Sequence, residues 1–135
     1  HDGKPAAMIL RASLAIPPGV QFFTDEDNPF QFGFHNQKAG VVLHPHIHRM
    51  DAPITVTEIQ EFLYILSGKI TVSLYTHSGT VYTTVTLSAG DGILLMSGGH
   101  GVTYIEDTKM FEIKQGPYPG TSNAKIYFEK QEPTV

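Results

Sequence analysis

The sequence predicts an all-β fold in which two curved antiparallel sheets close into a small barrel or jelly roll. Short β-favouring runs separated by turn residues follow one another along the chain, and no long segment has a helical period. One run also alternates strictly, with Ile70, Val72 and Leu74 separated by more polar neighbours. Such alternation places every second side chain inside the barrel and the others outside.

Ten strands are expected from the runs of β-favouring residues between turn signals. They cover residues 7–14, 30–35, 41–48, 62–66, 70–75, 81–87, 93–96, 102–105, 110–114 and 125–128. Gly68-Lys69 and Ser78-Gly79 are expected to form the tight reversals that bring neighbouring strands into an antiparallel sheet. Prolines and glycines at 17–19 and 116–120 separate the terminal segments from the barrel strands.

Composition predicts a single domain over residues 1–135. The chain is 41% hydrophobic, which suffices for one core at this length, and it shows no internal repeat or low-complexity tract. The absence of cysteine excludes a disulfide framework, a thiolate nucleophile and cysteine-based zinc sites. Histidine and carboxylate side chains must therefore hold any metal.

The segment 40–48 carries the most informative residues of the chain. If it is a strand, its two-residue period places His44, His46 and His48 on one face. Imidazole groups bind transition metals well, whereas Mg²⁺ and Ca²⁺ prefer oxygen-rich ligand sets. Glu61 opens a later β-favouring run, and His100 follows a glycine turn farther along the chain. These residue types predict a mixed histidine and carboxylate site.

The chain resembles the cupin superfamily at these positions. The first cupin motif has a glycine, five residues, His-x-His, a gap, a glutamate, six residues and a glycine. Gly40, His46, His48, Glu61 and Gly68 occupy those places. The second motif is matched by Gly90, Gly98 and His100, and the resemblance covers roughly residues 38–115.

The sequence departs from the cupin pattern in both motifs. Twelve residues, 49–60, separate His48 from Glu61 where the family has three or four, so Glu58 remains an alternative to Glu61 as the carboxylate ligand. Met96 stands at the position of the motif proline, one residue is missing between Gly98 and His100, and Tyr104 stands where an asparagine is common.

The resemblance implies a cupin-type antiparallel β-barrel, also called a double-stranded β-helix, with a divalent transition metal bound by His46, His48, Glu61 and His100. Fe, Mn, Ni, Co and Zn all accept this ligand set. His44 lies outside the motif, and either an outer-shell or a substrate-contacting role fits it. His77 lies in a polar hairpin loop and is expected to be solvated.

Candidates for catalysis beyond the metal have no motif around them. Tyr104 shares its strand parity with His100, so it is either an acid or substrate-binding residue or a barrel-lining tyrosine. Glu112 and Lys114 share a face of their strand, and a surface ion pair is the favoured interpretation.

Three functional classes remain open. The first is a metal-dependent enzyme, of dioxygenase or isomerase type, that acts on a small oxygenated molecule. The second is a metal-independent epimerase or ketoisomerase of activated sugars, in which the histidines would act as acid and base groups. The third is a non-catalytic module that binds a small ligand.

The expected partner besides a small molecule is a second copy of the chain. Phe22, Phe23, Phe30, Phe32 and Phe34 make the N-terminal third aromatic, either as core or as cover for a partner subunit, and cupins of one domain commonly form homodimers. The formal net charge of −4 comes without a basic stripe, so nucleic acid is not expected as a partner. No apolar run reaches the length of a membrane span and no signal core begins the chain, so a cytoplasmic protein is expected.

Overall fold

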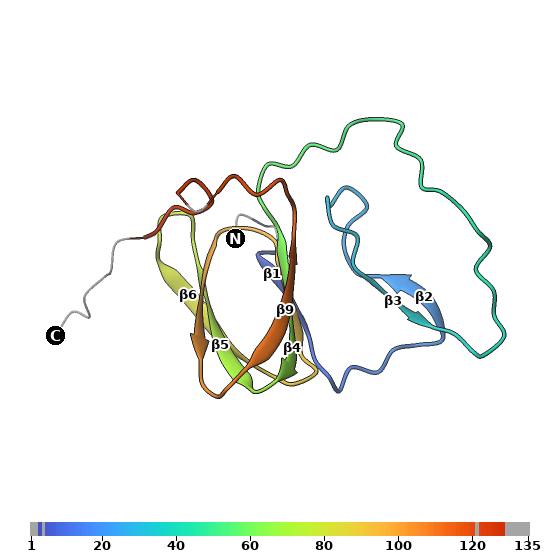
Figure 1. Ribbon diagram of the computed structural model, residues 1–135, viewed down its shortest axis with the longest axis horizontal. Helices are drawn as coiled ribbons and strands as arrows, with labels where there is room; N and C mark the ends of the chain where they lie inside the picture. The colour runs from blue at the N-terminus through green and yellow to red at the C-terminus, as the bar shows by residue number, and fades with distance from the viewer. Residues whose placement is uncertain (1–2, 4, 121, 129–135) are drawn as a thin grey trace. The chain divides into compact units, whose positions relative to one another are not determined.

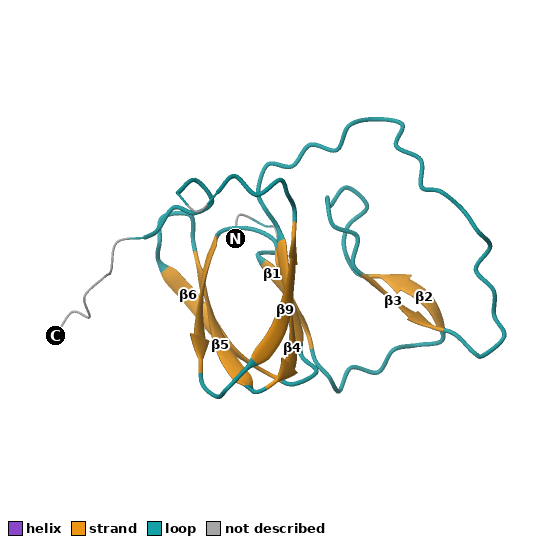
Figure 2. Ribbon diagram, viewed as in Figure 1, coloured by secondary structure: helices purple, strands orange, loops and turns teal. Residues whose placement is uncertain are grey.

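The structure is a computed structural model that describes residues 3, 5–120 and 122–128. These residues form strands and loops and contain no helix, which confirms the all-β prediction (Figures 1 and 2). The described strands are β1 (Ala7–Leu10), β2 (Gly19–Phe22), β3 (Gly33–Asn36), β4 (Glu61–Ser67), β5 (Lys69–Tyr75), β6 (Val81–Ser88), β7 (Gly92–Leu95), β8 (Gly99–Tyr104) and β9 (Lys109–Lys114). Within the described part of the chain, no helix has the length and apolar character needed to cross a membrane.

The chain divides into two compact units. The first unit consists of His1–Ala12 together with Ile59–Val135, and the second consists of Ser13–Glu58. The first unit contains seven of the nine described strands, and the second contains the β2–β3 hairpin. The single domain expected over residues 1–135 stays a prediction.

Two antiparallel sheets build the first unit. One has the strand order β1-β7-β4-β9 and the other the order β6-β5-β8. Both sheets contribute to one hydrophobic core, whose buried residues are Leu63, Ile65, Ile70, Val72, Leu74, Leu87, Ile93 and Leu95. A core shared by two sheets is the arrangement that buries one face of each.

Alternation along β5 is the pattern that the sequence predicted. Ile70, Val72 and Leu74 are buried, while the residues between them are half-buried. Because successive side chains of a strand point to opposite faces, the apolar set of β5 faces the core. β7 is buried along its whole length and is a central strand, paired with β1 on one edge and with β4 on the other.

The bend at Gly68 differs from the expected reversal. β4 and β5 belong to different sheets, so Gly68-Lys69 carries the chain from one sheet to the other and does not form a hairpin. Gly68 has a φ of +85°, and a Cβ atom there would lie 2.3 Å from the backbone oxygen of Asp107. Glycine is therefore required both by the left-handed backbone and by the close approach of the loop.

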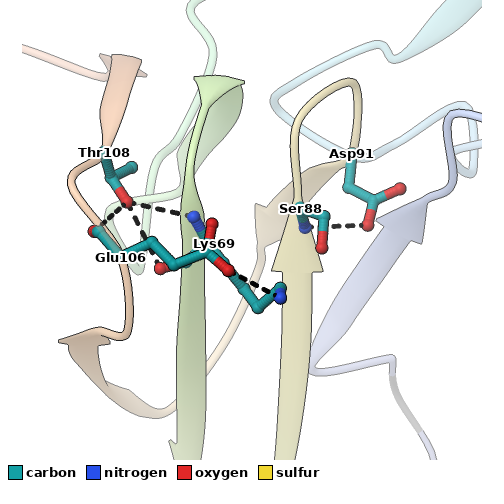
Figure 3. Close-up of polar contacts among 5 residues, drawn as sticks. All are labelled: Lys69, Ser88, Asp91, Glu106 and Thr108. Atoms are coloured by element: carbon teal, nitrogen blue, oxygen red, sulfur yellow. Dashed lines mark hydrogen bonds and ion pairs between the residues drawn. The ribbon is translucent and has the colours of Figure 1, made fainter.

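The loop between β8 and β9 clamps this bend (Figure 3). The carbonyl of Lys69 accepts hydrogen bonds from the backbone N–H groups of Ile105 at 2.9 Å and Glu106 at 3.2 Å. Lys69 N donates to the hydroxyl of Thr108 at 3.2 Å, and Lys69 Nζ lies 2.7 Å from Glu106 Oε1. The change of sheet at Gly68 is thus fixed by contacts about 40 residues away in the chain.

The reversal at Ser78-Gly79 is confirmed. β5 and β6 pair directly on either side of it, and Thr76 N donates to the carbonyl of Thr80 at 2.9 Å. Gly79 has a φ of +86°, which the turn requires and other residues rarely adopt.

The second unit contains a hairpin that the sequence pattern only partly predicted. β3 lies close to the expected strand at 30–35, whereas β2 was not expected. The two strands pair from Gly19 opposite Asn36 to Phe22 opposite Gly33. Phe23 and Phe32 both contact Phe34 edge to face, with centroid distances of 5.5 and 5.4 Å. Part of the aromatic cluster therefore packs within this unit.

Two expected strands are wrong. Residues 41–48 and 125–128 lie in no strand, and the apolar side chains of the first segment are exposed, with Ile47 at 87%. Pro45 interrupts the first segment and has no N–H to donate to a ladder. The prediction for 7–14 was also too long, because β1 ends at Leu10, where its pairing with β7 ends. β-favouring composition alone does not supply a partner strand.

Candidate functional site

Glu61 and His100 meet at one end of the first unit. Glu61 is the first residue of β4 in the four-stranded sheet, and His100 is the second residue of β8 in the three-stranded sheet. Their Oε1 and Nε2 atoms lie 3.7 Å apart. The side chains are only 13% and 31% exposed, so the pair is largely withdrawn from solvent.

Strand parity explains why these two side chains face each other. Glu61 has the same parity as the core residues Leu63 and Ile65. His100 lies opposite the buried Leu74 in the ladder of β5 and β8. Both side chains therefore point toward the space between the sheets, at the end where the apolar core gives way to polar groups.

An ion pair from β9 adjoins Glu61. Lys114 lies directly opposite Glu61 in the β4–β9 ladder, and Glu112 lies opposite Leu63. Lys114 Nζ is 2.5 Å from Glu112 Oε1, with side chains 34% and 39% exposed. The expected ion pair is confirmed. Its two residues lie opposite inward-facing residues of β4, so they belong to the inward-facing side of the four-stranded sheet. The hydrogen bond from Lys114 to Glu112 raises the pKa of the lysine.

The surroundings of Glu61 raise the pKa of its carboxyl group. Burial raises the pKa of Glu61 above 4.5, and the negative charge of Glu112 adds to the rise. His100, Lys114 and Lys125 act in the opposite direction, and the pKa stays raised. A half-buried carboxyl group with a raised pKa beside a histidine is typical of functional sites.

His46 and His48 lie in the second unit, in the extended segment that follows β3. Their ring centroids are 5.0 Å apart and the rings are inclined at 73°. His46 Nδ1 lies 2.8 Å from the backbone oxygen of His44, so a hydrogen bond from this nitrogen leaves Nε2 to act as a ligand. All three histidines are exposed.

The structure thus brings the four predicted ligands together as two pairs, one in each unit. Across the described residues, no three His, Cys, Asp or Glu side chains gather closely enough to hold a metal ion.

The Glu61–His100 pair by itself fits a shared metal ion. Two ligand atoms bound to one ion at about 2.0–2.2 Å lie roughly 3.0–3.5 Å apart. The observed 3.7 Å separation therefore needs a shift of less than about 1 Å. One oxygen and one nitrogen donor are also a suitable start for a transition-metal site.

The remaining candidates lie apart from this pair or on its border. Tyr104 lies on the same face of β8 as His100, as expected from the sequence. In the ladder with β5, Tyr104 is opposite Ile70 and His100 is opposite Leu74. Tyr104 ends β8, about 13 Å along the strand from His100, and is 60% exposed. Glu58, the alternative carboxylate ligand, is the last residue of the second unit, whereas Glu61 lies beside His100 in the first unit.

Sequence reasoning missed two residues near the site. Lys125 acts electrostatically on Glu61, and Gln115 Oε1 accepts a hydrogen bond from the backbone N–H of Gln60 at 2.8 Å. Neither residue has a motif around it. Finding Gln115 would have required the register between β4 and β9, because this register places Gln115 just beyond the last ladder pair.

Comparison of the chain with protein-family models, with curated proteins and with solved structures finds no match.

Proposed function

We propose that this protein is a metal-dependent enzyme, of dioxygenase or isomerase type, that acts on a small oxygenated molecule. The proposed metal ligands are His46, His48, Glu61 and His100. The observation that carries the proposal is the pairing of Glu61 with His100, 39 residues apart in sequence, at the polar end of a shared β core. The cupin-like spacing of the other two histidines supports it.

The ligand set favours a divalent transition metal, and Fe, Mn, Ni, Co and Zn remain candidates. When bound, such an ion supplies open coordination positions for oxygen atoms of a substrate. Lys114 holds a positive charge beside Glu61 and is suited to bind a carboxylate or hydroxyl group of that substrate. Tyr104, the proposed catalytic residue, would reach only a substrate that extends along β8.

The finer fold belongs to the same proposal. Two antiparallel sheets around one core support a jelly roll of the cupin type, with the site at one end.

Metal content tests the proposal directly. Untagged protein is loaded separately with each of the five ions, excess ion is removed by gel filtration, and bound metal is measured by elemental mass spectrometry. We expect close to one ion per chain for at least one metal. Loss of an outer-shell partner alone costs about 10–100-fold in affinity, so Glu61→Gln, His100→Ala and His46→Ala/His48→Ala should each lose at least that much.

The matched control is His35→Ala/His77→Ala, which removes two histidines outside the proposed site and should keep the metal. Circular dichroism checks that each variant remains folded. Equal metal binding by wild type and the Glu61 and His100 variants would refute the assignment of these ligands.

A metal-independent acid–base enzyme is the second candidate, because Glu61, His100 and Lys114 gather without help from the second unit. It predicts activity that persists after chelation and is lost in Glu61→Gln. A non-catalytic binding module would instead bind its ligand without turnover in either state.

A further inference from the structure

The chain that follows β9 crosses the end of the first unit where Glu61 and His100 lie. We call residues 115–120 and 122–128 the C-terminal strap. The strap starts after Lys114, which is paired with Glu61 in the four-stranded sheet. It ends at Phe128, whose ring lies against Gly99, the neighbour of His100 in the three-stranded sheet. Figure 1 shows this segment passing from the end of β9 toward the ends of β5 and β6.

Phe128 anchors the strap in a slot lined by two glycines and a tyrosine. Its ring centroid lies 5.5 Å from that of Tyr75, with an interplanar angle of 31°. A Cβ atom at Gly99 would lie 2.3 Å from the Phe128 ring, and one at Gly79 would lie 2.9 Å from it. Gly99 does not have a positive φ, so the feature that requires glycine there is the room for this ring.

Polar and charged groups tie the rest of the strap to Glu61. Gln115, at its start, accepts the hydrogen bond from the backbone of Gln60, the residue before Glu61. The positive charge of Lys125, near the end of the strap, lowers the pKa of Glu61. The strap therefore starts beside Glu61 and ends on the outer face of the three-stranded sheet, because Gly99 pairs with Tyr75 on the face opposite to that of His100. Between these two points it crosses the end of the first unit (Figure 1).

The contact that holds the far end of the strap is small. Ile126 and Tyr127 are 94% and 81% exposed, whereas Phe128 is 39% exposed. One ring makes the described apolar contact, so its release exposes little buried surface. Segments with few buried apolar contacts are those that open most readily while the rest of the fold stays intact.

We propose that the C-terminal strap is a gate over the Glu61–His100 pair, closed when Phe128 occupies its slot and open when the ring leaves it. What passes the gate, a metal ion and a small substrate, rests on the proposed function. The gate itself rests on contacts of the first unit alone.

Chemical modification of His100 by diethyl pyrocarbonate tests the gate without any metal. Chelator-treated protein is sampled over time, and peptide mass spectrometry gives the modification rate of each histidine. His35, in the second unit, is the internal standard in every sample. Phe128→Ala should raise the rate at His100 at least about threefold, in proportion to the larger open population, with no change at His35.

Two further variants separate the gate from a general loosening of the protein. Gly99→Ala should raise the modification rate of His100 as Phe128→Ala does, because the new methyl group displaces the ring. In the double variant, His100 should be modified no faster than in either single variant. Ile126→Ala removes an exposed neighbour of the anchor and should leave the rate unchanged.

An unchanged rate at His100 in both Phe128→Ala and Gly99→Ala would overturn the gate. This outcome is independent of the metal proposal, because a protein that binds one metal per chain could still show it. Conversely, faster modification in both variants of a protein that binds no metal would support the gate and reject the metal site.

Discussion

Asp91 is the buried carboxylate that joins the end of β1 to the turn between β6 and β7. Its side chain is 11% exposed. It accepts hydrogen bonds from the backbone N–H groups of Ala12 at 2.9 Å and Ser88 at 3.0 Å, and from Arg11 Nη1 at 3.0 Å. The contact with Ser88 is visible in Figure 3. Burial alone would raise the pKa of Asp91, but these donors outweigh it and lower the pKa below 3.8.

Asp91→Asn should therefore destabilise the protein by about 1–3 kcal/mol at pH 7, since an amide cannot accept all of these hydrogen bonds. Because the pKa of Asp91 is lowered in the folded state, its contribution to the free energy of unfolding is complete above the ordinary pKa of an aspartate. This contribution is lost as the pH falls through the pKa of the folded state. The difference between variant and wild type in urea unfolding should thus shrink below about pH 4.

The matched control is Asp107→Asn in the exposed loop before β9, for which we expect a change within about 0.5 kcal/mol. A penalty for Asp91→Asn that stays constant down to pH 2 would show that the charge of Asp91 contributes nothing.

At the scale of elements, the decisive feature of the first unit is the bend that moves the chain from β4 to β5. Gly68→Ala introduces a methyl group into a left-handed backbone and against the loop at Asp107 and Thr108. Left-handed backbone costs about 1–2 kcal/mol, and overpacking adds about 1–3 kcal/mol. We expect a loss of at least about 2 kcal/mol in the free energy of unfolding, measured by urea titration.

Gly101→Ala in β8 is the contrasting control. Gly101 does not have a positive φ, and its Cβ atom would meet the ring of Tyr75 at an ordinary 3.5 Å. Because alanine restricts the unfolded chain, we expect no loss and a gain of up to about 1 kcal/mol. Equal losses in the two variants would mean that the Gly68 bend has no special backbone requirement.

For the whole molecule, the hydrophobic core lies entirely in the first unit. Residues 13–58 are half-buried or exposed throughout. A chain in which these residues are replaced by a Gly/Ser linker should keep the far-UV spectrum of a β protein and unfold cooperatively.

The register sets the linker length. Leu10 lies opposite Gly92 on one side of β7, and Glu61 lies opposite Leu95 on the other side. Gly92 and Leu95 are three residues apart along β7, so Leu10 and Glu61 are separated by about 14 Å. About eight flexible residues reach roughly 16 Å. Loss of cooperative unfolding would show that residues 13–58 stabilise the first unit. The shortened protein also lacks His46 and His48, so it should bind metal weakly.

The expected homodimer is also a property of the whole molecule, and the four-stranded sheet offers a face for it. Phe62 and Tyr64 of β4 and Phe111 and Ile113 of β9 share the outer face of the four-stranded sheet, where Phe111 contacts Tyr64 at 5.3 Å. Phe111 and Ile113 are 42% and 52% exposed. Exposed apolar residues that gather on one face are typical of subunit interfaces.

Light scattering on wild type should therefore give twice the chain mass, and Phe111→Ser/Ile113→Ser should shift the protein to monomer. Val81→Ser, which changes an exposed apolar residue of the other sheet, is the control and should remain dimeric. A monomeric wild type at micromolar concentration would refute the dimer.

The residues of the candidate site and the proximity of Glu61 to His100 were predicted from residue types and spacing, whereas the place of Lys114 beside Glu61 was not. Glu61 and His100 could be named as ligands because cupin-like spacing surrounds them, and the structure places them 3.7 Å apart. The position of Lys114 opposite Glu61 depends on the register of β4 and β9, which no short-range pattern specifies.

The sequence by itself determined which residues of β5 face the core, because the two-residue period of a strand is a local property. It also determined the hairpin at Ser78-Gly79, where the turn and its flanking strands are contiguous. Only the tertiary structure decided that Gly68 leads to a second sheet, that residues 41–48 form no strand, and that Phe128 of the C-terminal strap lies against Gly99. Each of these depends on a partner distant in the chain, and a strand or a bend is stable only where such a partner supplies its hydrogen bonds and its packing.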